Sequence, residues 1–117
     1  SEENSTAELV EFDDPMVANQ LFGPNNAHLH LLASASGAHI AGEGLVDTPD
    51  LRVRQALCNV FLQLYGLFKS GVNVTQEDIA RAYEMVRSDP GVVLSEVYRD
   101  AVFIHTPRKT VTARNVA

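Results

Sequence analysis

The stretch best suited to chemistry is a short glycine loop between two predicted helices, with the sequence Gly23, Pro24, Asn25, Asn26. Two apolar residues precede this loop, and Leu29 is the first large apolar residue of the helix that follows. The start of a helix presents unpaired backbone N–H groups and the positive end of the helix dipole, which together attract phosphate. We therefore expect residues 23–26 to contact a nucleic-acid backbone.

This layout resembles the loop of KH-type modules, in which two apolar residues precede Gly-x-x-Gly and an apolar residue follows. Here Asn26 takes the place of the second glycine, and neither middle residue is basic. Pro24 also lacks a backbone N–H that could meet a phosphate. The resemblance implies a KH-like shape with a weakened RNA contact. The alternative is a plain helix-turn-helix corner in which Gly23 only ends the first helix.

Two histidines follow the loop, and the first of them is a further candidate for RNA contact. His28 would meet a phosphate when protonated. His28 and His30 lie two positions apart, so on a helix they point about 200° apart and do not face one ligand. The chain has one cysteine, Cys58, and four histidines, so we predict no metal site. We expect Cys58 to pack as a small apolar residue, and we find no catalytic constellation.

Charge is distributed unevenly along the chain, whose net charge is −6. Residues 1–51 contain nine acidic residues and no Lys or Arg. Lys and Arg at phosphates supply most non-specific affinity for nucleic acids, so this half gives the loop no electrostatic support. Arg108, Lys109 and Arg114 lie within the last ten residues. We expect this basic tail to contact RNA or an acidic neighbouring surface, or to be a solvated linker.

Length and composition exclude several classes of protein. A chain of 117 residues predicts one domain with one core. No apolar run approaches the roughly 20 residues of a membrane span. The N-terminal residues are polar and acidic, unlike a signal peptide. We therefore expect a cytoplasmic protein with no membrane partner.

The loop must be positioned by elements in the order strand, helix, loop, helix, two strands, long helix. Asp14 and Asn26 are expected to cap the first two helices, and Thr75 with Asp78 resembles a capping box. Apolar periodicity and the placement of Gly, Pro and capping residues predict helices at 15–22, 27–36, 48–70, 76–88 and 94–101. The same signals predict strands at 9–12, 39–41 and 45–47, and a strand or extended arm at 102–104.

The predicted fold is α+β: a small three-stranded sheet packed by helices on one face, KH-like, in a single domain. We expect residues 9–105 to form this domain. Residues 1–8 would be a disordered or added tail, and residues 106–117 a basic C-terminal linker.

Three parts of the chain resemble the N-terminal domain of PhoH-like proteins, a bacterial family named for phosphate starvation. They are residues 10–14 with 21–23 and 26–29, residues 64–68 with 74–79, and residues 104–111 with 113–115. In that family the third part leads into a P-loop ATPase domain that uses ATP and Mg²⁺. The chain itself contains no G-x-x-x-x-G-K-[ST] motif. It departs from the family between residues 37 and 49, where the hairpin is short and Glu43 replaces a commonly basic residue.

The resemblance implies a non-catalytic accessory domain without a cofactor of its own. It would bind single-stranded RNA weakly on behalf of the ATP-binding domain that follows in the parent. The alternative is an interaction domain that organises ATPase subunits as a homo-oligomer or binds another protein. Its support is the acidic surface and the second side of the long helix, at Cys58, Leu62 and Tyr65, which we expect the core to cover only in part.

Overall fold

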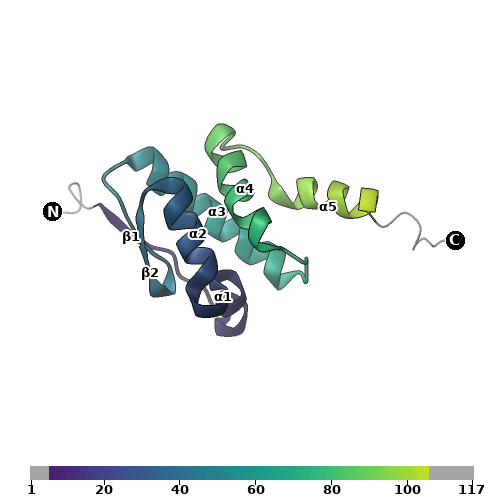
Figure 1. The fold of residues 1–117 in the computed structure, drawn as a ribbon, viewed down its shortest axis with the longest axis horizontal. Coiled ribbons are helices and arrows are strands. Elements are labelled where there is room, and N and C mark those ends of the chain that lie inside the picture. Colours follow the sequence, from purple (N-terminus) through teal and green to yellow (C-terminus); the bar gives the residue numbers. More distant parts are fainter. Residues whose placement is uncertain (1–5, 106–117) are drawn as a thin grey trace, which may run out of the picture.

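The computed structural model describes residues 6–105, with side chains described through residue 99, as a small sheet covered by helices (Figure 1). Strands β1 (Ala7–Leu9), β2 (His39–Ala41) and β3 (Leu45–Asp47) form an antiparallel sheet in the order β1-β3-β2. The α+β class and the order of elements around the loop are as predicted. The second and third strands also lie at the predicted residues.

The sheet has one covered face and one open face. Val46 is fully buried at the centre of β3, while its neighbours Leu45 and Asp47 are exposed. The register places Ile40 of β2 opposite Val46, and Ile40 is also buried. Successive side chains of a strand point to opposite faces, so the helices pack on the Val46 face alone.

The first strand is shorter and earlier than predicted. The predicted strand at 9–12 is wrong, because β3 has only three residues and its pairing with β1 ends at Leu9 opposite Leu45. Val10 donates one more backbone hydrogen bond to the oxygen of Gly44, at 3.2 Å, and the chain then leaves the sheet. Phe12 packs edge-on against Phe22 in the helical layer. β1 thus begins inside the segment that we expected to be a tail.

The two helices that flank the loop begin and end as predicted. α1 (Pro15–Phe22) starts after Asp14, whose carboxylate accepts the N–H groups of Met16 and Val17. α2 (Ala27–Ser36) ends at a glycine in the left-handed conformation. Both helices contribute fully or nearly fully buried leucines to the core, so packing sets the orientation of the loop between them: Leu21, Leu29 and Leu32.

The long helix α3 (Leu51–Lys69) is the centre of the core, but it begins three residues later than predicted. The true N-cap is Asp50, which accepts the N–H groups of Arg52 and Val53. Thr48 instead accepts the N–H of Asp50 through its hydroxyl, in the turn that precedes the helix. One face of α3 carries its fully buried side chains: Leu57, Val60, Phe61 and Leu64.

Two further helices complete the domain. α4 (Gln76–Ser88) has the predicted capping box between Thr75 and Asp78. α5 (Leu94–His105) runs through residues 102–104, so the predicted strand or arm there is wrong. A helix satisfies the backbone groups of these residues internally, without a partner strand. Among the described residues, no helix combines the length and the apolar character that a membrane crossing requires.

Candidate nucleic-acid interface

The glycine loop is a tight turn with an unusual backbone. Gly23 has φ +81° and ψ 168°, a region that is essentially restricted to glycine. Asn25 and Asn26 are both left-handed, with φ 54° and 58°. The N–H of Asn26 donates to the oxygen of Gly23 at 3.0 Å, which closes the turn. Pro24, Asn25 and Asn26 are all exposed, so the turn presents its polar side chains to solvent.

Asn26 does not cap α2 with its side chain, contrary to prediction. A side-chain cap requires an extended backbone at the N-cap residue, and Asn26 is left-handed. The side chains of Asn25 and Asn26 make no hydrogen bond to any described residue. Each carries two N–H donors and a carbonyl acceptor. Two free carboxamides therefore stand at the positive end of the α2 dipole.

His28, predicted to meet a phosphate, is buried beneath the loop. The side chain is 7% exposed, and its Nδ1 lies 2.9 Å from the backbone oxygen of Leu21. A carbonyl oxygen only accepts, so Nδ1 carries the hydrogen. The ring also stacks on Phe68 of α3, with 6.1 Å between centroids. His28 fastens the start of α2 to the end of α1 beneath the loop.

Gly23 and His28 fit together closely. A Cβ atom added to Gly23 would lie 2.7 Å from Cγ of His28, closer than such atoms approach. Two constraints therefore favour glycine at this position: the positive φ, and the imidazole ring that leaves no room for a Cβ atom. The sequence shows the glycine as a helix stop, but it does not reveal that a buried imidazole lies against it.

The electrostatic surroundings of the loop are acidic. The turn at residues 42–44 lies beside it, because a Cβ on Gly42 would be 3.8 Å from Nδ2 of Asn26. The middle residue of that turn is Glu43, which is exposed. No Lys or Arg occurs in residues 1–51 to balance this charge. The loop thus offers hydrogen bonds to a phosphate but no formal positive charge.

A polar cluster at the start of α1 holds this helix against α3. The hydroxyl of Tyr65 donates to the carboxylate of Asp13 and accepts the N–H of Asp14 at 3.0 Å. Lys69 lies 3.8 Å from the same carboxylate. The hydrogen bond from Tyr65, and secondarily the charge of Lys69, lower the pKa of Asp13. The tyrosine ring also stacks on Phe12, so this part of α3 is covered.

Replacing Tyr65 with phenylalanine is expected to raise the pKa of Asp13 toward its ordinary value. Because the folded-state pKa is lowered, the carboxylate stabilises the fold above its unfolded pKa. That stabilisation is lost as pH falls through the folded value. A carboxyl NMR titration measures the shift. Lys69→Gln is the comparison and should move the pKa less, since the hydrogen bond is the larger cause; an unmoved pKa in Tyr65→Phe would contradict the assignment.

The remaining sequence predictions concern the basic tail, metal binding and Cys58. Arg108 and Lys109 lie outside the described residues. Within the described part of the chain, no group of three or more His, Cys, Asp and Glu side chains could hold a metal ion. Cys58 is partly buried, and burial raises its pKa to about 11, so the thiol stays protonated at neutral pH. It packs against the core as the sequence predicted.

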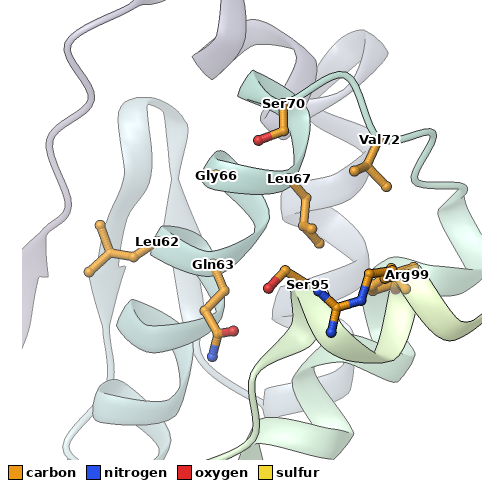
Figure 2. Close-up of a pocket in the computed structure, with 9 residues that line it drawn as sticks. Leu62, Gln63, Gly66, Leu67, Ser70, Val72, Ser95 and Arg99 are labelled. Atoms are coloured by element: carbon orange, nitrogen blue, oxygen red, sulfur yellow. The ribbon is translucent and has the colours of Figure 1, made fainter.

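A groove of about 530 Å³ runs between α3 and α5 (Figure 2). Its apolar lining includes Leu67, Val72 and Tyr98, and Arg99 reaches across it. Leu62 stands at its edge and is 58% exposed. Of the three residues expected on an uncovered side of the long helix, Leu62 is the one that remains largely exposed. The sequence missed this groove because its walls come from two helices, α3 and α5, whose packing against each other no local pattern shows.

Comparisons of the chain with protein-family models, with curated proteins and with solved structures return no match.

Proposed function

We propose that this domain is a non-catalytic nucleic-acid-binding module that contacts single-stranded RNA through the loop at residues 23–26. In a PhoH-like parent it would present RNA to a P-loop ATPase domain that uses ATP and Mg²⁺. One observation carries the proposal: two exposed carboxamides, Asn25 and Asn26, stand without partners at the N-terminus of α2. The order of elements around them is the KH-like order expected from the sequence.

The lack of Lys and Arg in the loop limits its expected affinity for RNA. Phosphate contacts without Lys or Arg release no counterions, so the loop alone gives little affinity at physiological salt. Hydrogen bonds from uncharged amides to a charged phosphate contribute about 1.5–3 kcal/mol each at most. We therefore expect an affinity in the high micromolar range at low salt. Such weak binding suits a module that works beside a stronger RNA contact in the same protein.

Changing both loop asparagines to aspartate is expected to weaken RNA binding by about tenfold or more. The double variant Asn25→Asp with Asn26→Asp replaces N–H donors with carboxylates that repel phosphate. Fluorescence anisotropy of a labelled 12-nucleotide oligouridylate, at 20 mM salt, measures the affinity. Ser95→Asp with Val97→Asp adds the same charge at exposed positions of α5, which packs against α3. Equal losses in both double variants would remove the loop from the RNA contact.

A second candidate function is self-association, and the groove between α3 and α5 favours it. Exposed Leu62 and the neighbouring apolar wall could pack against a second copy of the chain. Sedimentation velocity across a range of protein concentrations separates the two candidates. A concentration-dependent dimer without RNA binding would favour self-association, and a monomer that binds RNA would favour the nucleic-acid module.

A further inference from the structure

The positive charges of the described domain are concentrated away from the glycine loop. A groove of about 390 Å³ lies between the first half of α3 and the end of α4. Two arginines, Arg52 and Arg87, line it, and both are exposed. Between them lie the amides of Gln55 and Asn59 and the apolar surface of Ala56 and Val86. Of the other grooves described, none combines two cationic side chains.

The carboxylates nearest in sequence to these arginines are engaged elsewhere. Asp50 accepts the backbone N–H groups that begin α3. Asp89 accepts the backbone N–H of Gly91 at 3.0 Å. Neither Arg52 nor Arg87 has an ion pair with a described residue. Glu84 is the remaining nearby acid, and it lines the adjoining hollow on the α2 side of Arg87. The lining of this groove therefore contains two guanidinium groups and no carboxylate, and neither arginine forms an ion pair with a described residue.

The helix dipoles do not change this conclusion. Arg52 lies in the first turn of α3, where the positive dipole end disfavours a cation and favours an anion. Arg87 lies in the last turn of α4, where the negative end favours a cation. The two dipoles act in opposite senses, so the guanidinium groups decide the sign of the groove. Arginine presents a planar fork of N–H donors that matches phosphate oxygens.

We propose that Arg52 and Arg87 bind backbone phosphates of the single-stranded nucleic acid and supply the positive charge that the glycine loop lacks. This inference rests on the proposed function. Arg87 also lies beside Ser36, at the C-terminal end of α2, whereas the loop lies at its N-terminal end. The ten residues of α2 separate the two contacts by about 15 Å. The strand would then run along the side of the domain on which α2 lies (Figure 1).

The test is the salt dependence of binding of a labelled 12-nucleotide oligouridylate. Two phosphates neutralised on a single strand give a slope of log Kobs against log[salt] of about −1.4. In Arg52→Gln with Arg87→Gln we expect the slope to become less negative by about this amount and the affinity at 20 mM salt to fall about tenfold. Arg52→Lys with Arg87→Lys should keep most of the slope. Arg81→Gln with Arg99→Gln removes two exposed charges outside this groove and should resemble the wild-type chain.

Any other outcome overturns the arginine groove, the proposed RNA-binding function, or both. If the wild-type chain binds RNA and the double glutamine variant shows the same salt slope, the arginine groove is not the phosphate site. The proposed function is then unaffected. If the wild-type chain does not bind RNA at low salt, both the arginine groove and the proposed function are wrong. If a labelled oligo-aspartate peptide binds with the same slope and RNA does not, the groove takes an acidic protein segment and the nucleic-acid assignment is wrong.

Discussion

Replacing Gly23 with alanine is expected to lower the free energy of unfolding by about 3–4 kcal/mol. An L-residue at φ +81° and ψ 168° is strained by about 1–3 kcal/mol. The new methyl group would also lie 2.7 Å from the ring of His28 and displace it. Displacement would break the bond from Nδ1 to the oxygen of Leu21 in a buried setting. Urea denaturation followed by circular dichroism measures the loss.

Gly37→Ala is the matched control for this experiment. Gly37 also has a positive φ, +78°, but no atom lies within 4 Å of the added Cβ. The control should therefore lose only the backbone term, about 1 kcal/mol. The difference between the two variants reports the contact with His28 together with the greater backbone strain at Gly23, whose ψ is 168° where that of Gly37 is 2°. Equal losses would show that the ring yields at little cost, and His28 would then not be the group that fastens α1 to α2.

The double variant Gly23→Ala with His28→Ala separates the backbone strain at position 23 from the steric clash with the imidazole ring. Without the imidazole the added methyl group has room, so the two substitutions are expected to be non-additive. The double variant should be less destabilised than the sum of the two single variants, by about 1 kcal/mol or more. Strict additivity would mean that the glycine and the histidine do not interact in the folded state.

Local signals in the sequence predicted the N-caps of α1 and α4 and two of the three strands. Asp14 and Thr75 were identified because a cap and its partner lie within three residues of each other. β2 and β3 were found because glycines bracket two short apolar stretches. In each case all the residues that determine the structure are neighbours along the chain, so the pattern is visible without tertiary contacts.

The errors arose where distant residues decide the outcome. β1 ends at Leu9 because β3, far along the chain, is only three residues long. His28 was predicted to meet a phosphate, but it is buried and its ring stacks on Phe68, forty residues later. No local pattern distinguishes a buried histidine from an exposed one on a short helix.

The candidate sites divide in the same way. The loop at residues 23–26 is continuous in sequence and was predicted, although the exposure of its two carboxamides was not. The arginine groove joins Arg52 and Arg87 from two helices, and it exists only after α3 and α4 pack. Charge counts alone placed the basic character of the chain in its C-terminal tail. The packing shows a second concentration of cations in the domain itself.

One glutamine makes two hydrogen bonds to the segment that begins α5, and replacing Gln63 with methionine is expected to loosen that helix. The side chain makes three hydrogen bonds. Its amide donates to the oxygens of Val92 and Asn59, at 3.0 and 2.8 Å, and its oxygen accepts the N–H of Leu94 at 2.8 Å. Methionine keeps the length and apolar contacts of the side chain and removes every one of these bonds. At about 1 kcal/mol each, the loss is about 2–3 kcal/mol.

Amide hydrogen exchange shows which part of the domain loses this stability. The bonds of Gln63 join α3 to the segment that begins α5, so local opening of α5 is expected to rise by roughly 100-fold. Exchange in α2 and β3 should stay near the wild-type rate. Gln55→Met, on the same helix, is the matched control, because Gln55 is exposed and makes no hydrogen bond to a described residue. Uniformly faster exchange across the domain would mean that α5 unfolds with the core as one unit. In that event the groove between α3 and α5 would be as permanent as the core, and a partner docked there would meet a rigid surface.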